Sequence, residues 1–271
     1  MKTLVHLSDL HFGRVDEALL DPLVESVHSA APDVVVVSGD LSQRARTAQF
    51  QPAAAFLARL PSPQIVVPGN HDVPLYNVLA RFLAPLAKFR RHIEADLSPS
   101  YTDTEIAVLG VNTARSFVVK NGRINQEQVA ALRAKFHTLA DGMVKVVVTH
   151  HPFDIGEGVA EKELVGRARM AMSVFAECGV DLLLAGHLHV SHSEDTGERY
   201  ALSGYEALVV SAGTATSTRG RGEANSFNVI RLSKDRIEVE RREWQPGPGR
   251  FVSAPSETFV RRERGWAPAT L

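Results

Sequence analysis

The stretch Val66-Val67-Pro68-Gly69-Asn70-His71-Asp72 decides how the rest of this chain is interpreted. An apolar run from Ile65 to Val67 stops at Pro68-Gly69, which predicts a buried strand followed by a tight turn. The turn presents an amide, an imidazole and a carboxylate at three consecutive positions. Glycine permits backbone conformations that bring such side chains toward one point. Alone, the stretch is equally consistent with an ordinary polar turn, so its meaning depends on how the other strands end.

Four other apolar runs end in residues of the same chemical types. These are 3–7 followed by Asp9 and His11, 34–37 followed by Asp40, 145–148 followed by His150, and 181–184 followed by His187 and His189. Amphipathic helices are predicted over 16–30 and 47–60, so strand and helix alternate as in parallel βαβ units. Ligands of such sheets bind at the carboxyl ends of the strands, so we predict that these side chains gather at one edge.

The rest of the chain continues this α/β pattern and then changes character. We predict a helix over 77–92 broken or kinked at Pro85, a strand over 106–111, a helix over 126–139 capped by Asn125, a loop over 156–166, and a helix over 170–177. Segments 207–211, 227–232 and 237–240 are predicted to complete a sheet as antiparallel strands. We expect one domain, 1–245, and a C-terminal extension, 246–271, that drapes over the surface or reaches the neighbouring subunit of a homodimer.

Composition excludes several classes of protein. The chain has 271 residues, enough for a substantial core, and a formal net charge of −1 that argues against a basic nucleic-acid groove. Its single cysteine, Cys178, excludes an internal disulfide framework and suits a reducing compartment. No apolar stretch approaches the ~20 residues of a membrane-spanning helix, and no signal peptide is evident. We therefore expect a cytoplasmic protein without a membrane span.

The side chains at the strand ends are typical of a metal centre. Crowding imidazoles and carboxylates at one edge is unfavourable unless cations hold them together. Nitrogen and oxygen donors without thiolate favour manganese, iron, cobalt or zinc ions over a structural thiolate zinc site. A carboxylate can bridge two metals ~3.5–4 Å apart, and a bridging hydroxide can then attack phosphorus in line. The sequence thus predicts two divalent transition-metal ions at this edge, with chemistry suited to attack on phosphorus.

The order of the motifs resembles that of the calcineurin-like metallophosphoesterase superfamily, and within it the bacterial class III cyclic nucleotide phosphodiesterase branch. The resemblance rests on Asp9-x-His11, Gly39-Asp40, Gly69-Asn70-His71-Asp72, His150-His151-Pro152 and Gly186-His187-x-His189. These motifs span residues 9 to 189, about two thirds of the chain. The resemblance implies an α/β sandwich of two sheets flanked by helices, and a metal-dependent phosphoric diester hydrolase.

The resemblance also implies a role for each motif residue. One metal would be held by Asp9, His11, Asp40 and His189. Asp40 would bridge to a second metal, held also by Asn70, His150 and His187. His71 would be no ligand, but would contact the phosphate and protonate the leaving group.

Other residues near the strand ends have less certain roles. Asp72 is expected to support its turn, and Gln43 stands where some family members carry an acid that orients the histidine equivalent to His71. His151 is expected either to support its neighbouring ligand or to face the substrate. Candidate substrate contacts, with Asn70 and His71, are Arg14, Asn112 and Arg115.

Three functions remain open at this point. The first is a phosphodiesterase for cyclic nucleotides or glycerophosphodiesters. The second is a pyrophosphatase for a nucleotide-activated lipid such as a UDP-diacylglucosamine, for which residues 73–100 would provide an apolar cap. The third is a non-catalytic scaffold with the same fold, which the complete set of predicted ligands argues against. A nuclease is disfavoured by the near-neutral net charge.

Overall fold

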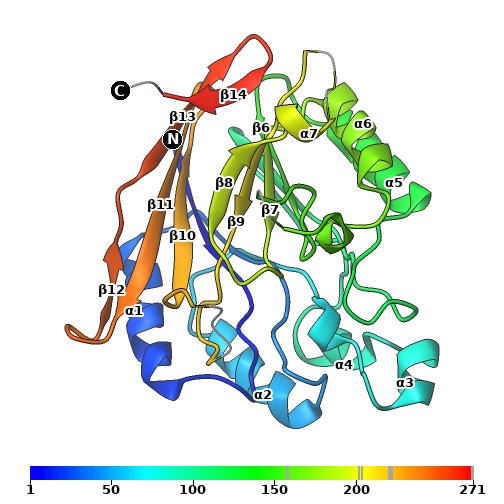
Figure 1. The fold of residues 1–271 in the computed structure, drawn as a ribbon, viewed down its shortest axis with the longest axis vertical. Helices are drawn as coiled ribbons and strands as arrows, with labels where there is room; N and C mark the ends of the chain where they lie inside the picture. The colour runs from blue at the N-terminus through cyan, green and yellow to red at the C-terminus, as the bar shows by residue number, and fades with distance from the viewer. Residues whose placement is uncertain (157–158, 201, 203, 219–221, 270–271) are drawn as a thin grey trace.

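The computed structural model describes residues 1–156, 159–200, 202, 204–218 and 222–269. Two mixed β-sheets pack face to face, and helices cover the outer face of each sheet (Figure 1). This arrangement confirms the predicted α/β sandwich. Within the described parts of the chain, no helix has the length and hydrophobicity needed to span a membrane.

The first sheet has the strand order β14-β13-β11-β10-β1-β2-β3, with β12 paired to β11. Its strands are β1 (Lys2–Leu7), β2 (Val34–Val37), β3 (Gln64–Val66), β10 (Ser226–Leu232), β11 (Arg236–Gln245), β12 (Arg250–Ser253), β13 (Glu257–Arg262) and β14 (Gly265–Pro268). β1, β2 and β3 are parallel, as predicted, and β10 runs antiparallel to β1. The carboxyl ends of the three parallel strands therefore lie at one edge.

The second sheet has the strand order β4-β5-β6-β7-β9-β8. Its strands are β4 (Ser100–Thr102), β5 (Ile106–Gly110), β6 (Val144–Val148), β7 (Leu182–Ala185), β8 (His192–Asp195) and β9 (Leu208–Ser211). The antiparallel pairing predicted for 207–211 is confirmed only on one side, because β9 pairs antiparallel with β8 but parallel with β7. The chain between them, with the unpredicted edge strand β8, provides the crossover that a parallel pairing requires.

Helices bury the outer faces of both sheets. The helical elements are η1 (Glu17–Leu19), α1 (Leu20–Ser29), α2 (Thr47–Leu57), η2 (Asn70–Asp72), α3 (Val78–Leu83), α4 (Ala87–His92), α5 (Gln126–Phe136), η3 (Glu161–Glu163), α6 (Ala168–Cys178) and α7 (Gly197–Tyr200). α1, α2 and α4 pack on the first sheet, and α5 and α6 pack on the second. The predicted helix over 77–92 is interrupted around Pro85 and forms α3 and α4.

The four-valine strand β2 shows how the layers are held together. Val34 and Val36 belong to the core between the sheets, together with Val146 and Leu184 of the second sheet. Val35 and Val37 face the opposite way, into the core beneath the helices of the first sheet. A strand that is buried on both faces needs apolar residues at every position, which explains the uninterrupted valine run.

The C-terminal residues do not simply drape over the surface as predicted. β12 and β13 both pair with β11, and β14 pairs with β13 and extends the first sheet. Trp266 of β14 is 1% exposed and joins the core between the sheets. The division into 1–245 and 246–271 remains a prediction, but most of the second segment is paired into the same sheet.

Candidate metal centre

The polar turns after β1, β2, β3, β6 and β7 meet at one edge of the sandwich, as the sequence predicted. Asp9, His11, Asp40, His187 and His189 all have positive φ, between 49° and 73°. They are five of the eight non-glycine residues with positive φ in the described ranges, so left-handed backbone is concentrated at this edge. Such conformations cost about 1–3 kcal/mol each and persist where surrounding contacts impose them. They aim the side chains back toward a common point.

The first group of donor atoms comes from the turns after β1 and β7. Asp9 and His11 are fully buried, and His189 is 6% exposed. His189 Nε2 and His11 Nε2 lie 3.3 and 3.5 Å from Asp9 Oδ1. The two imidazole nitrogens are 3.4 Å apart. Asp9 is fixed through its other oxygen, which accepts hydrogen bonds from Ser8 Oγ and His187 N.

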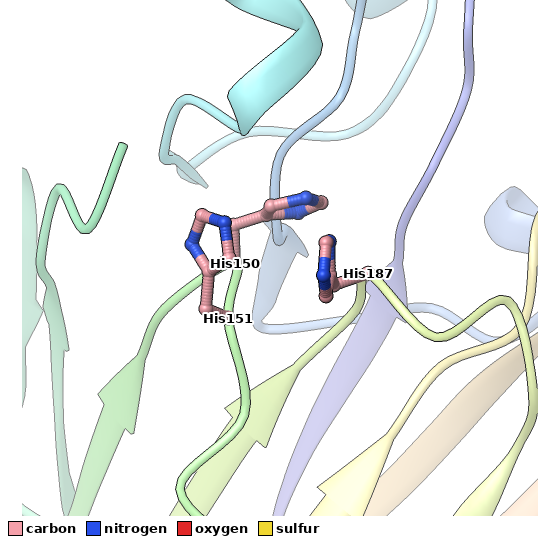
Figure 2. A group of neighbouring side chains, drawn as sticks. All are labelled: His150, His151 and His187. Carbon is pink, nitrogen blue, oxygen red and sulfur yellow. The ribbon is translucent and has the colours of Figure 1, made fainter. Parts of the chain in front are cut away.

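The second group comes from the turns after β3, β6 and β7. His150 Nε2 lies 3.4 Å from Asp40 Oδ1 and 3.2 Å from Asn70 Oδ1. The ring centroid of His187 is 5.1 Å from that of His150. His150 and His187 enter from the ends of neighbouring strands and approach each other (Figure 2). His150 is oriented by its Nδ1, which hydrogen-bonds Ser38 O at 2.8 Å.

Asp40 joins the two groups. Its Oδ2 lies 3.6 Å from His11 Nε2, and its Oδ1 lies 3.4 Å from His150 Nε2. The two carboxylate oxygens therefore face different histidines. Asp40 also accepts a hydrogen bond from His71 N at 2.8 Å, which fixes its orientation. This is the arrangement expected of a carboxylate that bridges two cations.

The separations between donor atoms fit ions held between them. Ligands ~2.1 Å from a metal lie about 3.0 Å apart at adjacent octahedral positions and about 3.4 Å apart at tetrahedral ones. The observed separations are 3.2–3.6 Å. Among the residues that the structure describes, Asp9 Oδ1 is also buried without a hydrogen-bond partner, as expected of an oxygen whose partner is a cation. The donor set contains only nitrogen and oxygen, in agreement with the predicted choice of metals.

The charges of the second group depend on burial and on close neighbours. Burial opposes ionisation of Asp40, but His150 outweighs it and holds the pKa of Asp40 well below its usual range. Burial likewise lowers the pKa of His150, but Asp40 raises it to about 9. Burial and the nearby His150 lower the pKa of His187 to about 4. A cation bound here would replace the proton on His150, because a histidine must be neutral to bind a metal.

The turn from Gly69 to Asp72 is held together by Asp72, as predicted. Its buried carboxylate accepts hydrogen bonds from the backbone N–H groups of Leu41, Ser42 and Gly69, and from Ser42 Oγ. These bonds tie the turn after β3 to the turn after β2. A Cβ atom at Gly69 would lie 2.1 Å from Asp40 Oδ1, so this close approach requires glycine.

His71 lies beside the first group but is oriented by the backbone. Its Nδ1 lies 3.0 Å from Gln43 O and 3.3 Å from the side-chain nitrogen of Gln43. A proton on Nδ1 that is donated to the carbonyl leaves Nε2 as the atom that gains and loses a proton. Gln43 thus orients His71 through its main-chain carbonyl. The ring centroid of His71 is 4.9 Å from that of His11.

His151 is buried beside the second group and is held there by protein groups. It is fully buried, with its Nδ1 bonded to Thr113 Oγ1 at 2.8 Å and its Nε2 bonded to Lys120 O at 3.0 Å. Both nitrogens are therefore occupied by protein groups. Its ring centroid lies 4.7 Å from that of His187 and 4.8 Å from that of His150, so the three rings form one cluster (Figure 2). Of the two roles predicted from the sequence, these contacts fit support of the ligands.

The remaining substrate candidates differ in where they lie. Asn112 Oδ1 accepts a hydrogen bond from Ala114 N within its own turn. Arg115 is turned into the protein, where it donates to Asn112 O, Ala114 O and Gln128 Oε1. Arg14 is exposed, just beyond His11 on the active edge. Of these three residues Arg14 is the most exposed, and substrate contact by any of them remains a prediction.

One acidic residue at the site was not predicted from the sequence. Glu163, at the end of η3, is 8% exposed, and its Oε2 lies 3.4 Å from His187 Nε2. Its other oxygen accepts a hydrogen bond from Lys120 Nζ at 2.6 Å. Glu163 belongs to a stretch, 156–166, without clear periodicity, so no local pattern distinguished it from Glu161. The only available signal was that this stretch directly follows the His150 turn.

Comparisons with known proteins agree with this geometry. A family model described as Calcineurin-like phosphoesterase matches residues 2–191. The 3',5'-cyclic adenosine monophosphate phosphodiesterase CpdA of Escherichia coli K12 is 24% identical over 217 residues, 74% of each chain. The glycerophosphodiester phosphodiesterase GpdQ of Enterobacter lignolyticus is 26% identical over 164 residues, 56% of this chain and 58% of that protein.

A solved structure shows the same fold. Purple acid phosphatase PPD1 from yellow lupin matches with a TM-score of 0.69 and 12% sequence identity, over 95% of this chain and 53% of the lupin chain. The predicted superfamily, fold and class of metal-dependent hydrolase are confirmed. From the match over 2–191, the chain belongs to the calcineurin-like phosphoesterase family.

Proposed function

We propose that this protein hydrolyses a small phosphodiester, of the cyclic nucleotide or glycerophosphodiester type, at a centre of two divalent transition-metal ions. The observation that carries the proposal is the position of Asp40. Its two oxygens face His11 of one donor group and His150 of the other. Two relatives named above act on a cyclic nucleotide and on glycerophosphodiesters, which supports the substrate class.

Each donor group would hold one ion. Asp9, His11, His189 and Asp40 would bind the first, and Asp40, Asn70, His150 and His187 would bind the second. When bound, such a pair of metals polarises the phosphate and supplies a deprotonated water at neutral pH. The protein holds the ligands rigidly, because their backbone is fixed by the two sheets and by the hydrogen bonds of Asp72.

His71 would complete the chemistry as a proton donor. The main chain of His71 is fixed to Asp40, and its Nδ1 is fixed to Gln43. A proton on Nε2 could then pass to the leaving oxygen as the ester bond breaks. The chain supplies no serine or cysteine among the donor groups to act as a nucleophile, so no phosphorylated enzyme is expected.

The test is a screen of purified, metal-reconstituted protein against cyclic nucleotides, glycerophosphodiesters and nucleotide-lipid pyrophosphates. We expect turnover of at least one diester that disappears with chelator and returns with added Mn²⁺. His150→Ala is the matched inactive control. Metal-independent turnover, or a phosphorylated enzyme trapped during turnover, would contradict the proposal.

One surface feature favours the nucleotide-lipid alternative. Leu79, Phe82 and Leu83 of α3 are 49–80% exposed, and the Phe82 ring packs 5.2 Å from that of Phe117, which is 89% exposed. The apolar residues predicted to form a cap over 73–100 therefore divide into two sets. Leu86 and Phe89 are buried in the core, whereas those of α3 are exposed. If acyl chains bind here, Leu79→Ser and Phe117→Ser should lower the rate on the lipid substrate and spare water-soluble diesters. If the variants turned over the lipid substrate as fast as wild type does, this alternative would be excluded.

A further inference from the structure

Most of the exposed large apolar side chains belong to two short segments of the chain. Among the described residues, nine large apolar side chains are exposed, and seven of them lie in 76–83 or 117–119. These seven, which we call the apolar patch, are Tyr76, Val78, Leu79, Phe82, Leu83, Phe117 and Val119. Single exposed apolar residues are common on soluble proteins, whereas a group of them marks a binding surface.

A buried arginine fastens the two segments together. Arg81 of α3 is 6% exposed, and its guanidinium donates at 2.6–3.0 Å to the main-chain oxygens of Pro74, Ser116 and Val118. The exposed rings of Phe82 and Phe117 meet across the same junction, with centroids 5.2 Å apart. A buried guanidinium is unfavourable unless its donors are satisfied, so these bonds hold α3 and 116–118 in one arrangement. The apolar patch is therefore a single surface built from both segments.

The surroundings of the apolar patch are basic. Residues 73–93 and 112–126 contain no Asp or Glu. They contain seven Lys or Arg residues, which are Arg81, Lys88, Arg90, Arg91, Arg115, Lys120 and Arg123. All except Arg81 and Arg115 are exposed, and of these five only Lys120 pairs with a carboxylate of the described residues. The whole chain has a formal net charge of −1, so positive charge is concentrated around this surface.

Cations border the apolar patch at both ends. The guanidinium of Arg44 lies over the ring of Tyr76, 5.8 Å from its centroid. Lys88 Nζ donates to the main-chain carbonyl next to Arg44, at 3.2 Å. At the other end of the patch, Lys120 follows Val119 directly. The apolar side chains thus have positive charge on two sides.

A membrane surface with anionic lipids matches both properties of this region. Apolar side chains can enter the boundary between lipid headgroups and acyl chains, while neighbouring Lys and Arg side chains meet lipid phosphates. A second copy of this chain matches less well, because a twofold interface would bring the two basic surroundings together. We propose that the apolar patch docks the protein on membranes that contain anionic lipids.

Docking in this way would bring the metal centre close to the membrane. α3 follows the turn that Asp72 closes, and 117–119 follows the carboxyl end of β5, so the patch adjoins the active edge. Docking goes beyond the proposed hydrolysis, since it requires neither metal nor substrate. It also differs from the nucleotide-lipid alternative, because the bulk lipid of any anionic bilayer would serve.

The experiment is co-sedimentation of the purified full chain, without substrate, with two kinds of lipid vesicle. One kind is phosphatidylcholine alone, and the other is phosphatidylcholine mixed with anionic phosphatidylglycerol. We expect wild type to bind the mixed vesicles at least about 10-fold more tightly, and to lose this preference as salt is raised. The Leu79→Ser, Phe117→Ser double variant should bind them at least about 10-fold more weakly than wild type, because contact with acyl chains is lost. Val159→Ser, which alters an exposed valine outside the patch, is the matched control and should bind as wild type.

A further variant tests the electrostatic part of docking. Arg91→Gln removes one exposed cation and should weaken binding to the mixed vesicles about 5-fold, without an effect on neutral vesicles. Melting curves that match wild type show that the variants are folded. Equal binding by wild type and the double variant, or binding of wild type to neither vesicle, would overturn docking. A dimer that the double variant abolishes would assign the patch to a second copy of the chain and overturn docking as well. A protein that docks but hydrolyses no diester would contradict only the proposed function.

Discussion

His71 is the residue whose role is most sharply testable. Its backbone is fixed to Asp40, but neither predicted ligand set needs it as a donor. A leaving-group acid matters most for esters of poorly acidic alcohols and least for activated aryl esters. We expect His71→Ala to keep both metals and much of its rate on a nitrophenyl diester, and to lose on the order of 10²-fold on an alkyl or ribose diester.

Metal content and two substrates are enough for the comparison. Equal losses on both diesters would remove the acid role and leave His71 as a phosphate contact. Loss of a metal ion would make it a ligand, which its closeness to His11 and Asp40 allows geometrically. Gln43→Ala is a useful companion, because Gln43 holds Nδ1 mainly through a main-chain carbonyl that the substitution retains. It should therefore lose much less than His71→Ala.

The residues of the centre were predictable, but their backbone conformations were not. Aspartate, asparagine and histidine after an apolar run are visible in any sequence. The positive φ angles at Asp9, Asp40 and His187 depend on packing between turns that are far apart in the chain. Glu163 was missed for a related reason. Glu163 lies beside His187 because two loops pair with each other, and the residues next to Glu163 in the sequence do not indicate that pairing.

Among the elements, β11 and β12 depend on one buried carboxylate. Glu240 of β11 accepts hydrogen bonds at 2.7–2.8 Å from three side chains on three strands. The donors are Arg231 of β10, Arg242 of β11 and Ser253 of β12. Burial favours its neutral form, but the hydrogen bond from Arg242 and those from Ser253 and Arg231 lower its pKa from 4.5 to about 2. A depressed pKa stabilises the fold above the unfolded value, and that stability is lost as pH falls from about 4.5 through 2.

Glu240→Gln should therefore destabilise the protein by about 2–3 kcal/mol at pH 7, or several degrees in Tm. Near pH 3 about half of the difference from wild type should remain, because the unfolded carboxylate is then mostly protonated. Melting curves at the two pH values measure both effects. Glu238→Gln, on the same strand and half-buried, is the control and should cost less than about 1 kcal/mol. A Glu240→Gln difference that does not shrink at low pH would contradict this account.

The same region shows why some elements could not be predicted. The strands β1, β2, β6 and β7 could be predicted because both of their faces are buried, so each forms an uninterrupted or nearly uninterrupted apolar run in the sequence. β12, β13 and β14 are short, lie among Pro, Gly and Arg residues, and have at most alternate positions buried. Their pairing is decided by the exposed edge that β11 offers, which is known only once the sheet has formed.

For the molecule as a whole, the metal centre should be coupled to folding. Asp9 and Asp40 are at most 1% exposed and are surrounded by histidines, an arrangement that is unfavourable without cations. Ions that bind only the folded chain stabilise it by about 2.7 kcal/mol each at 100 times their Kd. Saturation with Mn²⁺ should thus raise the Tm of metal-stripped protein by about 10 °C or more.

Asp40→Ala should abolish most of this rise, because Asp40 contributes an oxygen to each donor group. Metal analysis should then find two ions per wild-type chain and fewer in the variant. Glu105→Gln alters a half-exposed side chain just before β5, at the opposite edge of the second sheet, and should behave as wild type. One ion per chain at saturation, with stoichiometry and Tm rise unchanged in Asp40→Ala, would mean that Asp40 bridges nothing. That outcome would also contradict the proposed two-metal centre, because its two donor groups share Asp40 as their common carboxylate.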